Sequence, residues 1–292
     1  MTARRTGLPI VSPVSELLAV LSSLMWGTAD FLGGTFTRRL RPLTVVSLTV
    51  PAAVPVLLVV VLVSGEWRAP TGYLPWALAS GPVGLLSVTA FYRALATGTM
   101  GVVAPLAATG VVVPLVVGLV QGGAPSPVAL AGLVLATVAT IAASASGRTD
   151  DDSPPPSRRP LLLAFVSGLG FGFVTVGIGE GAHSSVLMTL LVMRSASSVV
   201  LLGVLLALRQ RPRVSARDGG LLWLVGLMDA GANAVYGSAV RIGVFSVIVV
   251  LGSLYPAATV LLARQVHGER LQRLQVVGVL ALLVAVPMIA VG

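Results

Sequence analysis

Long apolar runs separated by short polar breaks fill almost the whole chain. Each run holds about 20 residues, which as a helix rising 1.5 Å per residue crosses a hydrocarbon layer of about 30 Å. The breaks fall at Arg, Pro and Gly, and they predict ten transmembrane helices, with ends that such signals place to within a few residues. The predicted spans are 15–37, 43–63, 73–96, 100–120, 127–146, 161–181, 185–208, 219–240, 244–264 and 271–291. The pattern therefore predicts an all-α integral membrane protein.

A polar, proline-rich stretch, GRTDDDSPPPSRRP at 147–160, separates the first five spans from the last five. Its charges and prolines cannot lie in lipid and are typical of an exposed linker. The chain is thereby divided into a first five-helix unit over 1–146 and a second over 161–292.

The two units resemble each other at a single offset of 145 residues. At this offset Trp26 meets Phe171, Gly98 meets Gly243, and seven residues of the first span meet identical ones: Leu17, Leu18, Ala19, Ser22, Leu24, Gly27 and Gly34 meet Leu162, Leu163, Ala164, Ser167, Leu169, Gly172 and Gly179. Repeats leave such a fixed offset. Because five is odd, the second unit enters the membrane in the opposite direction. Inverted repeats of this kind build many secondary transporters around one central site.

Composition agrees with a membrane protein. Of the 292 residues 55% are hydrophobic and 10% are charged, with a mean hydropathy of +0.97, whereas soluble proteins carry about 25% charged residues. The 19 basic residues, all Arg, exceed the 10 acidic ones and give a net charge of +9. Since most lie between spans, membrane topology accounts for them and no nucleic-acid partner is expected. There is no cysteine, which excludes disulfides and thiolate metal sites.

Several segments resemble the EamA group of the drug/metabolite transporter superfamily. They are the Trp-Gly helix SSLMWGTADFLGG at 22–34, its counterpart Phe171-Gly172, and residues 239–285 with Pro256, the Gly268-Glu269 pair and Gln275. The first half departs from the pattern, since Ala124 stands opposite Glu269. The resemblance implies a transporter of amino acids, nucleotide-like or sugar-like metabolites or drugs, often an exporter.

Two arguments on membrane orientation disagree. Four Arg residues lie on the side of the chain termini and thirteen on the opposite side, so the positive-inside rule places both termini outside. The family resemblance implies both termini in the cytoplasm. The sequence therefore leaves open whether cargo is imported or exported.

Ionisable residues inside a membrane span cost about 2.5–3.5 kcal/mol each on insertion scales, so they usually face a cavity or a partner. On the first helix Ser23, Trp26 and Asp30 share one face, because they follow each other at i, i+3 and i+7. This face is a candidate substrate path. The alternative is that Asp30 lies near the helix end and reaches the headgroups.

The eighth predicted helix carries the best-placed polar face. Asp229, Asn233 and Tyr236 lie at i, i+4 and i+7 on an otherwise apolar span. A carboxylate at that depth is a candidate to exchange a proton as a transporter changes access, which predicts protons as a coupling partner. Hydrogen bonding between helices is the alternative.

The remaining candidates are single residues. Arg194 on the seventh helix matches an Arg often seen in this family, and it suits either an anionic cargo group or a buried pair with Asp229 or Asp30. Tyr92 and Arg93 on the third helix carry the same ambiguity. Tyr255, followed by Pro256, is a candidate to break the ninth helix locally and line the cavity; the alternative is a simple kink, which is common at a Pro in a membrane helix.

Motifs for ATP hydrolysis, metal catalysis and covalent catalysis are absent from the sequence. We therefore expect no enzyme, no cofactor and no metal site, and a transporter of small metabolites driven by a gradient. Proton coupling, efflux and a place in the cytoplasmic membrane are the preferred assignments. A passive channel and a non-transporting receptor or assembly subunit are the alternatives, while a lipid-modifying enzyme is improbable without catalytic residues.

Overall fold

The computed structural model describes residues 13–120, 126–144, 158–243, 245–269 and 273–290, and every regular element in these ranges is helical. The first half contains α1 (Pro13–Thr37), α2 (Pro42–Ser64), α3 (Leu74–Thr97), α4 (Met100–Ala108), α5 (Val112–Val120) and α6 (Pro127–Ser144). The second contains α7 (Arg159–Ala182), α8 (Val186–Ala207), α9 (Ala216–Ile242), α10 (Phe245–Gly252), α11 (Tyr255–His267) and α12 (Arg273–Ala290). The all-α prediction is confirmed. Most of the predicted linker lies outside the described residues.

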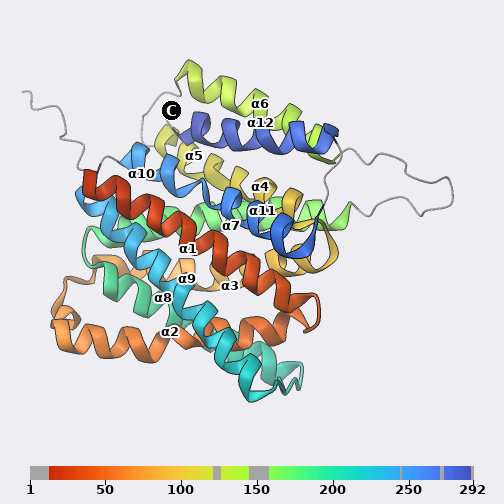
Figure 1. Ribbon diagram of the computed structural model, residues 1–292. Helices are drawn as coiled ribbons and strands as arrows, with labels where there is room; N and C mark the ends of the chain where they lie inside the picture. Colours follow the sequence, from red (N-terminus) through yellow and green to blue (C-terminus); the bar gives the residue numbers. More distant parts are fainter. Residues whose placement is uncertain (1–12, 121–125, 145–157, 244, 270–272, 291–292) are drawn as a thin grey trace, which may run out of the picture.

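The two halves are built alike and are interleaved. Each helix of the second half begins about 145 residues after its counterpart; α4, for example, starts at Met100 and α10 at Phe245. Helix packing repeats in the same way. In the first pair, α1 of the first half lies against α9 of the second, and in the equivalent pair α7 lies against α3. The last helices of the two halves, α6 and α12, lie side by side (Figure 1). The predicted pair of duplicated five-span halves is therefore confirmed.

Helix length and surface chemistry both fit a bilayer. Within the described residues, five helices are long and apolar enough to cross it by themselves: 13–37, 42–64, 71–97, 159–182 and 186–207. Large apolar side chains project from the outer faces of the bundle, with exposed fractions of 83% at Val63, 71% at Val199 and 69% at Leu86. Such a surface is unfavourable in water and favourable against lipid tails.

The fourth and ninth predicted spans are each divided in two, whereas the sequence predicted a break only in the ninth. In the ninth, α10 ends at Gly252 and α11 starts at Tyr255 with Pro256 in its first turn. In the fourth, the 3₁₀ turn Thr109–Val111 separates α4 from α5. That turn crosses α7 so closely that a Cβ on Gly110 would overlap the backbone of Gly168. Both interruptions of the regular α-helix therefore lie inside the bundle.

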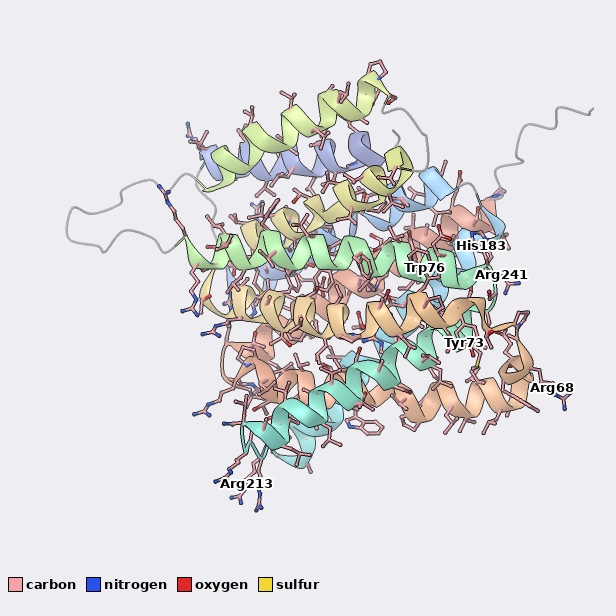
Figure 2. The ribbon with its side chains drawn as sticks, turned by 180° about the vertical axis from the view of Figure 1, so that it is seen from behind. Arg68, Tyr73, Trp76, His183, Arg213 and Arg241 are labelled. Atoms are coloured by element: carbon pink, nitrogen blue, oxygen red, sulfur yellow. The ribbon has the colours of Figure 1, made fainter. Side chains whose placement is uncertain are left out.

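Arginines gather at one end of the bundle, which we call the basic end. It contains Arg38, Arg39, Arg41, Arg209, Arg211, Arg213 and Arg217, around the end of α1 and the start of α9. Figure 2 shows Arg213 at this end and Arg68, His183 and Arg241 at the opposite one. The end of the bundle that faces the cytoplasm stays a prediction.

Glu269 ties the two halves together at the basic end. Its carboxylate accepts hydrogen bonds from the backbone N–H groups of Met100 (3.3 Å) and Gly101 (3.1 Å), at the start of α4, and pairs with Arg38 at the end of α1. The first N–H groups of a helix lack intrahelical acceptors, and a carboxylate there also offsets the helix dipole. The Thr35 hydroxyl and His267 Nε2 lie 2.8 Å apart beside it.

Glu269→Ala is therefore expected to destabilise the protein by about 1–2 kcal/mol, the usual cost of losing a helix cap. The apparent melting temperature in detergent falls by several degrees. Arg38→Ala is the matched control, because it removes the exposed ion pair and keeps the cap. A loss as large for Arg38→Ala as for Glu269→Ala would show that the ion pair, rather than the cap, provides the stability.

Candidate functional site

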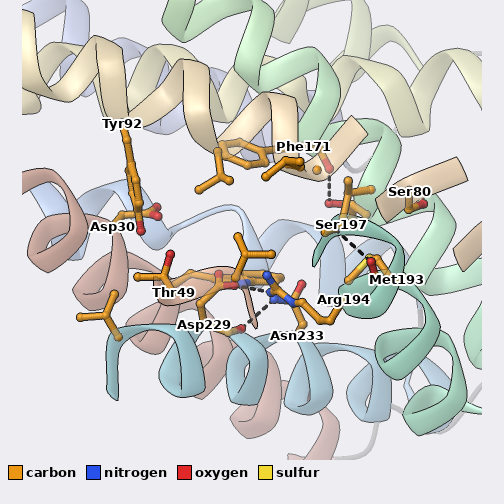
Figure 3. Close-up of a pocket in the computed structure, with 18 of the residues that line it drawn as sticks. Asp30, Thr49, Ser80, Tyr92, Phe171, Met193, Arg194, Ser197, Asp229 and Asn233 are labelled. Carbon is orange, nitrogen blue, oxygen red and sulfur yellow. Dashed lines mark hydrogen bonds and ion pairs between the residues drawn. The ribbon is translucent and has the colours of Figure 1, made fainter. Parts of the chain in front are cut away.

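A central cavity of about 130 Å³ lies between helices of both halves, near the middle of the bundle. This is space on the order of ten water molecules, which suits a small molecule. Polar or aromatic side chains reach it from seven helices (Figure 3). They are Trp26, Asp30, Thr49, Ser80, Tyr92, Phe171, Thr175, Arg194, Ser197, Asp229, Asn233 and Tyr255.

The cavity lies where the two repeats meet. Twelve of its nineteen lining residues form pairs 145 positions apart, so each pair comes from equivalent places in the two halves. The pairs are Trp26 with Phe171, Asp30 with Thr175, Thr49 with Arg194, Ser80 with Val225, Gly84 with Asp229, and Val88 with Asn233. Equivalent positions of the two repeats thus line the cavity. Each charged lining residue, however, has an uncharged residue at the equivalent position of the other half. The charge pattern therefore does not follow from the repeat itself.

Asp30 is the charged residue of this cavity that has no ion-pair partner among the described residues. Its carboxylate lines the cavity beside Tyr92, and it makes no hydrogen bond or ion pair with any residue that the structure describes. The side chain is partly buried, and the cavity is its open side. Asp30 therefore faces the cavity rather than the headgroups.

Arg194 and Asp229 form an ion pair across the cavity, between α8 and α9. Their side chains are 12% and 32% exposed, and Arg194 Nε is buried without a hydrogen-bond partner among the described residues. The Asn233 amide donates to the Asp229 carbonyl at 2.6 Å, one helical turn back. Of the two sequence-based alternatives for Arg194, the buried pair with Asp229 is the one present here.

Aromatic rings form the wall on the side of the broken helix. The rings of Trp26 and Tyr255 lie edge to face with centroids 6.4 Å apart, and Tyr255 is the first residue of α11. Phe171 on α7 occupies the place equivalent to Trp26. Tyr92 lies against α1 where Gly33 leaves room for its hydroxyl end. The cavity thus combines aromatic faces with one net negative charge.

Two predicted site residues lie elsewhere. Arg93 is exposed, and it is not among the described residues that line the central cavity or the smaller one beside it, although it directly follows Tyr92 on α3. Tyr236 lines a smaller cavity next to the central one. Sequence reasoning missed Thr49, Ser80, Thr175 and Ser197 as lining residues; Thr49 and Thr175 lie 145 residues from Arg194 and Asp30, so the repeat offset was the signal that could have found them.

Comparison with known proteins settles the family. The model of the EamA-like transporter family matches the chain twice, over residues 14–145 and 158–291. The chain belongs to the EamA-like transporter family. Membership implies membrane transport of small metabolites by a multi-pass membrane protein, and the family consists of transporters rather than enzymes.

Structural comparison agrees with this fold. A crystal structure described only as that of a protein superposes on this EamA-like chain with a TM-score of 0.65, at 16% sequence identity. The match covers 94% of this chain and 95% of the other. No curated protein shows a significant match. At this identity the likeness concerns the fold alone.

Proposed function

We propose that this EamA-like protein is a secondary active transporter of amino-acid-like or drug-like compounds that carry an ammonium group. It works by alternating access in the cytoplasmic membrane, uses protons as the coupling ion, and favours efflux. The observation that carries the proposal is the unpaired Asp30 carboxylate in a small cavity with aromatic walls. An unpaired membrane carboxylate is costly unless a proton or a cationic group neutralises it.

The aromatic wall supports a cationic group in the cargo. Trp and Tyr faces attract ammonium groups within about 6 Å of the ring, most strongly where water is excluded. Trp26, Tyr92 and Tyr255 line the same cavity as Asp30. The apolar remainder of the lining, such as Val88 and Leu85, suits an amphipathic rather than a strongly hydrated compound.

Coupling is assigned to Asp30 rather than to Asp229. Protonating Asp229 would leave Arg194 without its partner inside the membrane, and breaking such a pair is strongly unfavourable. Protonating Asp30 breaks no ion pair among the described residues. A proton and an ammonium group would then compete for one carboxylate, so that the release of one accompanies the binding of the other.

The test uses purified protein in liposomes with a pH gradient across the membrane. Uptake of a radiolabelled aliphatic or aromatic amine is expected to follow the gradient, to saturate, and to accelerate in exchange for unlabelled amine on the other side. Uptake that is linear in concentration with ion conductance would favour a passive channel. Amine binding with no flux at all would favour a receptor or assembly subunit.

A further inference from the structure

A surface groove of about 370 Å³ lies at the basic end, between the start of α2 and the end of α8. Three arginines line it: Arg41 at the N-cap of α2, and Arg211 and Arg213 on the chain between α8 and α9. None of the described residues that line the groove is acidic. Figure 2 shows Arg213 projecting from this end of the bundle. The groove therefore gathers positive charge at a place outside the central cavity.

The chain turns back sharply where α8 ends. Gln210 N–H donates to the Leu205 carbonyl at 2.9 Å, and Arg209 has a φ of 50°, in the left-handed region that side chains with a Cβ rarely adopt. The corresponding turn at the end of α2 uses Gly65 instead. A non-glycine residue persists in such a conformation where the surrounding structure requires it. Here the turn brings residues 210–213 back alongside α2, where they line the groove.

Pro212 places the two arginines of this segment on the same side. The residue before a proline is restricted to extended backbone, and side chains two positions apart in an extended segment point the same way. Arg211 and Arg213 accordingly line the groove together, with Arg41 on the other wall. None of the three forms a salt bridge with a residue that the structure describes. Because like charges repel, an anion in the groove would stabilise this arrangement.

The repeat provides an internal comparison at the opposite end of the bundle. By the offset of 145 residues, Arg211 is equivalent to Glu66, which lies in the 3₁₀ turn after α2. The Glu66 carboxylate accepts a hydrogen bond from the hydroxyl of Ser185, the N-cap residue of α8. At that end a carboxylate of the protein thus joins the end of α2 to the start of α8. At the basic end a guanidinium stands in its place, so the anion that fits this corner comes from outside the protein.

The groove lies at the depth of the lipid headgroups. Both helices that border it, α2 and α8, are long and apolar enough to span the bilayer, and the groove lies at their ends. Leu208 lines the groove and is 57% exposed, and Leu202, nearer the middle of α8, is equally exposed. Acyl chains can therefore pack along α8 below the arginines. Guanidinium groups bind phosphate oxygens in pairs, and basic pockets between transmembrane helices bind anionic lipid headgroups.

We propose that this groove binds the phosphate of an anionic phospholipid, with Arg41, Arg211 and Arg213 as the donors. The N–H groups of Thr44 and Val45 take no part, because both already donate to the Arg41 carbonyl, at 2.8 and 3.2 Å. A bound lipid joins the start of α2 in the first half to the chain after α8 in the second. The groove shares no lining residue with the central cavity, so the site is independent of the cargo.

The test is native mass spectrometry of the full-length protein in detergent, titrated with phosphatidylglycerol or with phosphatidylcholine of the same acyl chains. Each arginine near an anionic lipid contributes roughly fivefold in affinity, so wild-type protein is expected to bind phosphatidylglycerol at least about tenfold more tightly. Arg211→Gln with Arg213→Gln should remove most of this preference, and Arg41→Gln should reduce it about threefold. Arg217→Gln with Arg264→Gln is the matched control, because it removes two exposed charges that do not line the groove.

Three outcomes overturn the site: equal affinity for the two lipids in wild-type protein, an unchanged preference in the groove variants, or an equal loss in the control, which would indicate diffuse surface charge. Inorganic phosphate and glycerol 3-phosphate distinguish the sources of phosphate. Neither is expected to displace phosphatidylglycerol at millimolar concentration, and displacement would overturn the lipid assignment. The melting temperature without added lipid checks folding, and it should stay unchanged because the substituted arginines are exposed. No cargo is used, so a failure of the proposed transport function leaves this test intact.

Discussion

Asp30→Asn is expected to abolish pH-driven amine uptake and to weaken amine binding by at least about 30-fold. Truncating one partner of a buried charged hydrogen bond costs about 2–5 kcal/mol, and 1.4 kcal/mol corresponds to a factor of ten. Asparagine keeps the size of the side chain and removes its charge and its capacity to take up a proton. Binding is measured on purified protein, and flux in liposomes with and without a pH gradient.

Two variants separate the role of the charge from damage to the fold. Glu16→Gln neutralises another carboxylate of the same helix, one that lines neither cavity, and should leave uptake unchanged. Asp30→Glu keeps the charge and should retain part of the pH-driven uptake. If Asp30→Asn binds amines with wild-type affinity and still accumulates them along the gradient, Asp30 has no part in recognition or coupling.

The repeat offset predicted the architecture because it acts on the whole chain. One shift of 145 residues predicts that the second half repeats the helices of the first half in the same order. Because each half has an odd number of spans, it also predicts that the second half enters the membrane in the opposite direction. The same shift aligns the pairs that line the cavity, such as Gly84 with Asp229.

The hydrophobic pattern within a single span predicted less about where its helix is interrupted. The run from Met100 to Val120 contains a signal that the ten-span prediction did not use, because Pro114 has no N–H to donate to the carbonyl of Gly110, four residues earlier. The close contact of Gly110 with Gly168, by contrast, joins residues distant in the sequence and no local pattern shows it.

The sequence offered Arg194 as a partner for either Asp229 or Asp30, and it could not decide between the two pairings. Asp30 and Asp229 are both carboxylates on apolar helices, and the pattern of each helix gave Asp229 the better position. In the structure the two carboxylates differ in their partners. Arg194 on α8 pairs with Asp229, whereas Asp30 has no ion pair among the described residues. Likewise, Tyr92 and Arg93 are neighbours in sequence, and only helix packing turns one inward and the other outward.

The second large effect concerns the Arg194–Asp229 pair. Arg194→Thr is expected to destabilise the protein strongly, because it leaves Asp229 unpaired in a cavity that already holds the Asp30 carboxylate. Removing one partner of a buried pair costs about 3–5 kcal/mol, and the 32% exposure of Asp229 reduces that to roughly 1–3 kcal/mol. Asp229→Ala leaves Arg194 unpaired in the same way. Unfolding in detergent measures both.

The double variant Arg194→Thr with Asp229→Ala should be more stable than the sum of the single losses predicts. The first half already carries small residues, Thr49 and Gly84, at the equivalent positions, so the fold accommodates an uncharged pair there. We expect a coupling energy of about 1–3 kcal/mol from the double-mutant cycle. Purely additive losses would show that the two charges do not stabilise each other.

The same variants test what the pair does for recognition. With Arg194 present, the three charges that line the cavity sum to one negative charge, which matches one ammonium group. Arg194→Thr alone raises that to two, so the protein should come to favour diamines over monoamines of equal length. The double variant restores a single negative charge at Asp30 and should restore the preference for monoamines. Such a reversal would show that the Arg194–Asp229 pair sets the net charge of the cavity. A pair that only stabilises the fold would leave the preference between monoamines and diamines unchanged.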